Sequence, residues 1–116
     1  MTQRRFQRSD RIGELIRTIV ATEAERWDDD RLGFFTVTDV EMEADNRVAA
    51  VYYTAFDADP DQARDALDEA RPSVQRLVAS SVRMRHTPRI EFRLDRTREQ
   101  VDAIEAAIAR IHQQDQ

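Results

Sequence analysis

The residues Phe34–Phe56, FFTVTDVEMEADNRVAAVYYTAF, predict a β-hairpin. β-branched and aromatic residues fill both halves of this stretch, and such residues favour strands. Between the halves, Asp45 and Asn46 tolerate the left-handed backbone that a tight turn requires. We therefore expect Phe34–Glu43 to pair with Arg47–Phe56. Polar and apolar residues alternate imperfectly in the first of these strands, which is typical of a β-bulge.

Apolar residues at helical spacing flank the hairpin on both sides. Before it, apolar residues three and four positions apart predict a helix over Ser9–Glu25. After it, Asp59 and Pro60 are typical of a helix start, because an acidic cap precedes a proline at the first helical position. Pro72 lacks an N–H and clashes with the preceding turn, so we expect a helix–kink–helix at Ala70–Pro72, as two helices or one sharply kinked helix.

The rest of the chain predicts one more strand and one more helix. In RIEFRL, Arg89–Leu94, apolar and charged residues alternate, as in a strand with one buried face. Thr97–Gln100 matches a capping box, and an apolar stripe follows it, so we expect an extra C-terminal helix over residues 97–112. The order of helices and strands indicates an α+β fold.

Length and composition indicate one soluble domain. At 116 residues the chain is long enough for a single core, and its 41% hydrophobic and 35% charged residues are typical of globular proteins. It contains no cysteine, which excludes disulfides and thiolate metal sites. No apolar run approaches the length of a membrane span, and the polar start lacks the pattern of a signal peptide. We therefore expect a cytoplasmic protein with no membrane contact.

Positive charge is concentrated in two segments of this acidic chain, whose formal net charge is -5. Residues 1–17 hold five arginines against two acids, and residues 71–98 hold eight arginines against two acids. The intervening residues 18–70 hold four arginines against fifteen acids. Such asymmetry is typical of a nucleic-acid interface, provided that the two basic segments meet in the fold.

No catalytic or metal-binding pattern is present in the sequence. Gly13 and Gly33 stand alone, so no glycine-rich phosphate loop exists, and the acid run Asp28–Asp30 is typical of a solvated loop. His86 has only Ser80, Ser81 and Asp95 as nearby candidates for a catalytic group. We therefore expect no enzyme activity, no cofactor and no metal.

Arginines remain as candidates for a binding site, because the guanidinium fork suits phosphate contact and base stacking. Arg83, Arg85 and Arg89 surround the link before the last strand. Equally, these arginines are suited to pairing with the acids of the hairpin and the second helix, and the residues alone leave both readings open. The candidate RNA-binding residues are Arg4, Arg5, Arg8, Arg11, Arg71, Arg76, Arg83, Arg85, His86 and Arg89.

Several motifs resemble ribosome-binding factor A, a family of bacterial small-subunit maturation factors. They are Asp30-Arg31-Leu32-Gly33, Val37-Thr38-Asp39-Val40, Asp45-Asn46-Arg47, Val51-Tyr52-Tyr53-Thr54 and the block RMRHTPRIEFRLD, Arg83–Asp95. The resemblance covers nearly the whole chain up to Asp95. It departs from the family pattern at Asp29, where a proline is usual, and at Ala70–Pro72, where the family commonly has Ala-x-Gly.

The resemblance implies a single type II KH-like domain over residues 1–116, with residues 1–8 flexible. In such a domain a three-stranded sheet carries helices packed on one face. It further implies a monomer that binds the free small (30S) ribosomal subunit and assists late maturation of 16S rRNA, including 5′-end processing and cold adaptation. Release would follow from a change in the subunit or from an assembly GTPase. The alternative is a non-catalytic protein-interaction module of the same fold that does not bind RNA.

Overall fold

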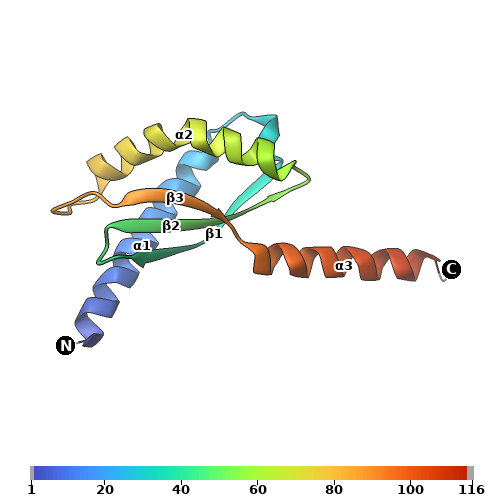
Figure 1. Ribbon diagram of the computed structural model, residues 1–116, viewed down its shortest axis with the longest axis horizontal. Helices are drawn as coiled ribbons and strands as arrows, with labels where there is room; N and C mark the ends of the chain where they lie inside the picture. The colour runs from blue at the N-terminus through green and yellow to red at the C-terminus, as the bar shows by residue number, and fades with distance from the viewer. Residues whose placement is uncertain (1, 115–116) are drawn as a thin grey trace.

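The computed structural model describes the backbone of residues 2–114 and the side chains of residues 8–97 and 104–111. The elements follow in the order α1 (Thr2–Ala24), η1 (Asp30–Leu32), β1 (Phe34–Glu43), β2 (Val48–Phe56), α2 (Pro60–Ser81), β3 (Arg89–Leu94) and α3 (Arg96–Gln114). The predicted α+β class is confirmed, and Figure 1 shows the arrangement.

The three strands form one mixed sheet in the order β1-β2-β3. β1 and β2 form the predicted antiparallel hairpin, whereas β3 pairs parallel to β2 after the crossover through α2. The predicted bulge is also confirmed, because the β1–β2 register shifts between Val37 and Asp39. Thr38 is the extra residue, and its hydroxyl donates to the carboxylate of Asp95 at 2.6 Å. The bulge therefore links β1 to the residue that follows β3.

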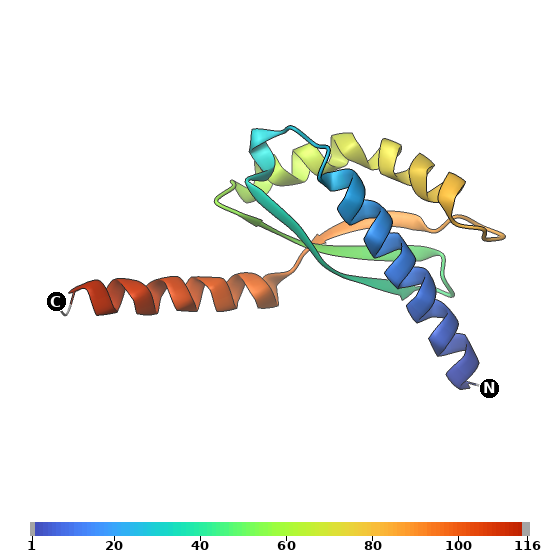
Figure 2. The same ribbon diagram turned by 180° about the vertical axis from the view of Figure 1, so that it is seen from behind.

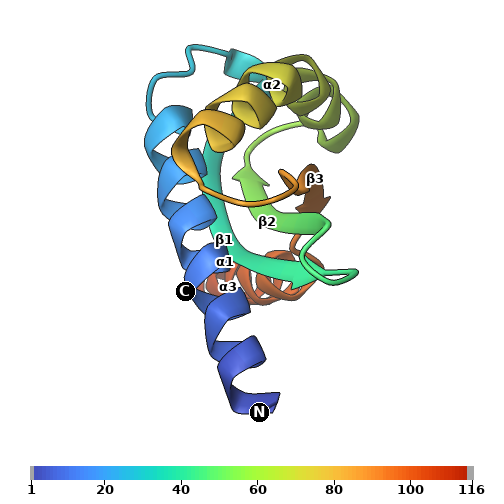
Figure 3. The same ribbon diagram turned by 90° about the vertical axis from the view of Figure 1, so that its left-hand side faces the viewer.

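The helices α1 and α2 cover one face of this sheet, as Figure 3 shows. Buried side chains from all three strands and both helices form the main core, so the expected helices on one face are confirmed. A second cluster under the start of α2 surrounds Leu67 and Tyr53, and Trp27, Phe35 and Phe92 contact both clusters. The main core consists of Ile16, Val20, Val37, Ala49, Val51, Val74, Val78, Val82 and Ile90.

The predicted start of the first helix is wrong. α1 begins at Thr2, seven residues before Ser9, whereas the flexibility expected for residues 1–8 stays a prediction. The apolar stripe from which the helix was predicted begins only at Ile12. Gln and Arg precede it, and both are good helix formers even without an apolar stripe.

The helix–kink–helix expected at Ala70–Pro72 is present as one bent helix and not as two helices. α2 runs without interruption from Pro60 to Ser81 and includes Pro72, and Figure 1 shows it bending over the sheet near its middle. The proline removes the hydrogen bond to the carbonyl of Asp68, and a bend is the usual response of a helix to this loss. Burial of Val74 and Val78 beyond the bend keeps the second half in place.

Replacing Pro72 by alanine is expected to raise the free energy of unfolding by about 2 kcal/mol. An interior proline costs about 3 kcal/mol in a helix, and roughly 1 kcal/mol of this is offset because proline also restricts the unfolded chain. Urea denaturation of the wild type and Pro72→Ala measures the difference. A loss of stability would contradict the argument and show that the core requires the bend.

The loop before β1 is held by an arginine between two carboxylates. Asp29, in the position where the family usually has proline, caps η1 by accepting from the N–H of Arg31 at 3.0 Å. The guanidinium of Arg31 also pairs with Asp29 at 2.7 Å and with Glu69 of α2. These hydrogen bonds from Arg31 hold the pKa of Asp29 and of Glu69 below their usual values of 3.8 and 4.5.

This arrangement predicts a pH-dependent stability. Because the two carboxyl pKa values are lower in the folded chain, their contribution is complete above about pH 4.5 and is lost as the pH falls through the folded-state values. We expect Arg31→Met to lower the urea midpoint at neutral pH and to lower it much less at about pH 2.5. A difference that stays constant with pH would contradict this role for Arg31.

The last helix projects from the domain. In Figures 1 and 2, α3 leaves the end of β3 and extends away from the sheet, and the whole molecule measures 59 × 35 × 20 Å. Its apolar stripe is largely exposed, at 58% for Ile104, 48% for Ile108 and 56% for Ile111. No described helix is long and apolar enough to cross a membrane.

Candidate nucleic-acid interface

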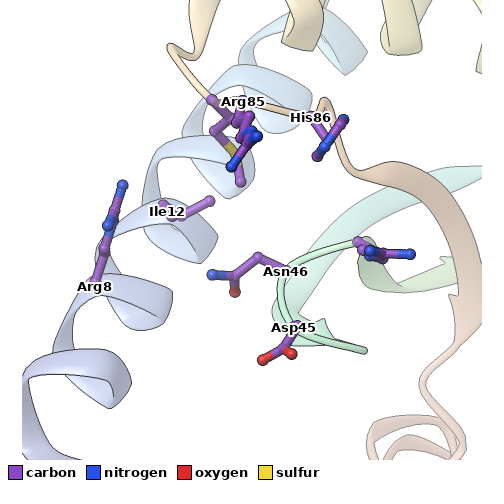
Figure 4. Close-up of a pocket in the computed structure, with 8 residues that line it drawn as sticks. Arg8, Ile12, Asp45, Asn46, Arg85 and His86 are labelled. Carbon is purple, nitrogen blue, oxygen red and sulfur yellow. The ribbon is translucent and has the colours of Figure 1, made fainter. Parts of the chain in front are cut away.

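The two basic segments of the sequence meet at one end of the molecule. A cavity of about 430 Å³ lies between the first half of α1, the β1–β2 turn (residues 44–47) and the link from α2 to β3 (residues 82–88), as Figure 4 shows. We call this cavity the basic groove. It is lined by Arg8, Ile12, Asp45, Asn46, Arg47, Met84, Arg85 and His86.

The β1–β2 turn forms one wall of the basic groove because its backbone is left-handed over three successive residues. Ala44, Asp45 and Asn46 have φ values of 51°, 56° and 66°. The predicted tolerance of Asp45 and Asn46 is confirmed, but alanine at position 44 gave no such signal. The hydroxyl of Ser9 in α1 donates to the side-chain oxygen of Asn46 at 3.0 Å, which fixes the turn against the helix.

The link is anchored at both of its ends. At its start, Val82 is buried and its N–H donates to the carbonyl of Val78 at 3.0 Å. At its end, the side-chain amide of Gln75 donates to the carbonyl of Pro88 at 2.7 Å and accepts from the N–H of Ile90 at 2.9 Å. The N–H of Arg89 donates to the carbonyl of Arg47 at 2.8 Å, which joins the link to the turn. Arg83, Arg85 and His86 are thereby held exposed.

Four arginines at this end have no ion-pair partner among the described side chains. Within the part of the chain whose side chains are described, no carboxylate lies within ion-pair distance of Arg8, Arg47, Arg83 or Arg85. Three of the side chains that line the basic groove are arginines, whereas Asp45 is the one carboxylate among them. A cluster of exposed guanidinium groups attracts anions, and their planar forks suit phosphate oxygens.

Three of the other candidate arginines lie beside the sheet or on α2. Arg76 donates to the hydroxyl of Ser73 at 3.2 Å, and Arg89 lies 3.9 Å from Glu91. The hydrogen bond from Arg93 holds the pKa of Glu91 below its usual value, and the charges of Arg89 and Arg71 add to this effect. The structure therefore favours pairing with an acid for Arg89, and neither Arg71 nor Arg89 lines the basic groove.

The remaining candidates lie on α1 and on the link. Arg11 and Arg83 are exposed but do not line the basic groove. The side chains of Arg4 and Arg5 lie outside the described residues. Arg47 was not among the predicted RNA-binding residues. Its position directly after the Asp-Asn pair of the predicted turn was a signal that could have identified it. It also lines a neighbouring cavity of about 310 Å³ together with His86 and Thr87.

Two of the three candidate catalytic partners of His86 form hydrogen bonds elsewhere. Asp95 follows the far end of β3 and accepts from Thr38, while the hydroxyl of Ser80 donates to the carbonyl of Leu77. Among the residues with described side chains, no three histidine or acidic groups converge as metal ligands. The arrangement is suited to binding an anion.

Comparisons with known proteins agree on one family. The family model described as ribosome-binding factor A matches residues 8–108. Ribosome-binding factor A from Thermobifida fusca is 38% identical over 111 residues, which cover 93% of this chain and 74% of the relative. The protein of the same name from Thermomicrobium roseum is 35% identical over 112 residues, covering 94% and 87%.

Solved structures show the same similarity. The crystal structure of ribosome-binding factor A from Thermus thermophilus superposes with a TM-score of 0.69 at 32% identity, covering 76% of this chain and 96% of that one. A homology model of Thermus thermophilus ribosome-binding factor A, fitted into a cryo-EM map of its complex with the 30S subunit, gives a TM-score of 0.62 at 33% identity, covering 72% and 91%.

Proposed function

Because the chain belongs to the ribosome-binding factor A family, we propose that it binds the free 30S subunit and assists late maturation of 16S rRNA. The maturation would include processing of the 5′ end and would support growth in the cold. Binding by a monomer, without catalysis, is sufficient for such a role. The observation that carries the proposal is the basic groove, where Arg8, Arg47 and Arg85 converge without ion pairs to described carboxylates.

The distribution of charge along the molecule supports binding of RNA at the end that contains the basic groove. The first half of α2 and the residues before it are rich in exposed acids, whereas the link at the end of α2 presents arginines and a histidine. An RNA phosphate backbone is attracted to the basic end and repelled by the acidic one, which orients the protein and opposes indiscriminate binding. Exposed acids at the repelling end include Asp57, Asp59, Asp61, Asp65, Asp68 and Glu69.

Co-sedimentation tests the proposal. The purified chain is centrifuged with free small subunits, free large subunits and assembled ribosomes over a range of salt concentrations. We expect binding to free small subunits only, weakening steeply as salt rises because phosphate contacts release counterions. A folded protein that ignores all three particles would contradict the proposal.

The second candidate is a protein-interaction module of the same fold, which the net charge of -5 favours. Such a module would bind a ribosomal or assembly protein, including an assembly GTPase, with little dependence on RNA. Digestion of the 16S rRNA in isolated small subunits separates the two functions. Binding that survives digestion favours the protein partner, and binding that is lost favours RNA.

A further inference from the structure

The basic groove has an apolar floor, which a surface that only follows phosphates does not need. Ile12 of α1 and Met84 of the link both line the cavity, and both are half-buried against the main core. In Figure 4, Ile12 points from α1 into the space between the helix and the turn. An apolar floor with polar groups at its rim is typical of pockets that hold a small organic group.

The rim carries planar side chains and a fixed hydrogen-bond donor. Asn46 accepts from Ser9 through its side-chain oxygen, which orients the amide and leaves its two N–H groups able to donate. His86 and Arg85 come from the link on the opposite side, and both are exposed. Imidazole and guanidinium groups stack on nucleobases, and an amide N–H donates to base nitrogen or carbonyl acceptors.

We infer that the basic groove holds one unpaired nucleotide of ribosomal RNA, an inference that rests on the proposed function. The base lies over Ile12 and Met84, stacks on a planar side chain of the link and accepts from Asn46. Its phosphates lie on Arg8 and Arg47. The adjoining cavity between Arg47, His86 and Thr87 receives the next phosphate of the strand.

The class of RNA follows from the position of the floor. A base inside a continuous duplex is covered by its stacked neighbours and cannot reach a recessed apolar surface, whereas a bulged or single-stranded base can. The ligand is therefore an unpaired nucleotide, held by its base as well as by its phosphates, and not an uninterrupted helix.

Two RNA hairpins of the same sequence test this inference. One is fully paired, and the other carries an additional unpaired 2-aminopurine as a single-nucleotide bulge. We expect the bulged hairpin to bind about tenfold more tightly, because stacking of one base on protein side chains increases the affinity by about this factor. The fluorescence of 2-aminopurine is expected to change on binding, because its stacking changes.

Two variants separate the base from the phosphates while leaving every arginine in place. Met84→Trp fills the floor of the basic groove. Asn46→Asp removes the amide N–H groups but keeps the side-chain oxygen that accepts from Ser9, and it tolerates the φ of 66° at this position. Both are expected to lose the preference for the bulge while binding the fully paired hairpin within about threefold of wild type. The paired hairpin thereby reports whether each variant is folded.

The outcomes distinguish this inference from the proposed function. Equal affinity of the wild type for both hairpins, with small-subunit binding intact, overturns the nucleotide pocket and leaves the proposed function standing. A bulge preference that survives in both variants also overturns it, because the base would then lie elsewhere. Failure to bind small subunits as well as RNA removes the proposed function and the inference together.

Discussion

Replacing Gly33 by alanine is expected to lower the free energy of unfolding by roughly 3 kcal/mol, the largest effect of any single substitution considered. Gly33 ends η1 with φ 56° and ψ -134°, a conformation that residues with a side chain rarely adopt. A Cβ at this position would lie 2.3 Å from the carbonyl oxygen of Phe56, so the loop and the end of β2 must separate. Equilibrium unfolding in urea measures the loss.

Gly13→Ala provides the matched control. Gly13 lies within α1, where a Cβ would be 3.2 Å from the carbonyl oxygen of Val40, a tight contact that small shifts relieve. Alanine favours the helix by about 0.5–1 kcal/mol, so the net change is expected to stay within roughly 1 kcal/mol. An equally small loss of stability in Gly33→Ala and Gly13→Ala would contradict the claim that the backbone conformation of Gly33 is required for the contact with the end of β2.

The second large effect is expected for small-subunit binding. Replacing Arg8, Arg47 and Arg85 together by glutamine is expected to weaken binding about 100-fold and to lower the slope of log affinity against log salt by about three. Each arginine neutralises about one phosphate, so each replacement removes about one unit of counterion release. These side chains are exposed and form no ion pairs with described carboxylates, so the fold is expected to remain intact.

A matched variant controls for net charge. Arg17, Arg26 and Arg110 are also exposed, lie outside the basic groove and give the same change of three charges when replaced by glutamine. This variant is expected to bind within about threefold of wild type and to keep its salt slope. Equal losses in the two variants would mean that the overall charge of the protein, and not the groove, governs binding.

The strands could be predicted from the sequence because their signals are local. The β-branched and aromatic runs placed β1 at its observed bounds, and the alternation in RIEFRL placed β3. The bulge was also visible, since the alternation fails where Thr38 is unpaired. A strand alternates every second residue, so an apolar face and its interruption are both readable over a few positions.

The helix ends and the groove depend on more than local pattern. Polar residues extend α1 to Thr2, and packing of Val74 and Val78 keeps α2 continuous through Pro72. Arg8 and Arg85 are far apart in the sequence, and their meeting depends on how α1 crosses the sheet, where Gly13 allows a close approach to Val40. The distribution of charge along the sequence therefore indicated a basic interface, but it could not predict which arginines line the groove.

The most direct test of the central claim, that the basic groove contacts ribosomal RNA, is photo-crosslinking on the small subunit. A photoreactive p-benzoylphenylalanine is placed at Arg85, and in a second protein at Arg26 near the other end of α1 as the control. We expect position 85 to crosslink to 16S rRNA in free small subunits and position 26 not to do so. Two results would contradict RNA contact by the basic groove. In one, position 85 crosslinks only to ribosomal proteins; in the other, position 26 crosslinks to RNA and position 85 does not.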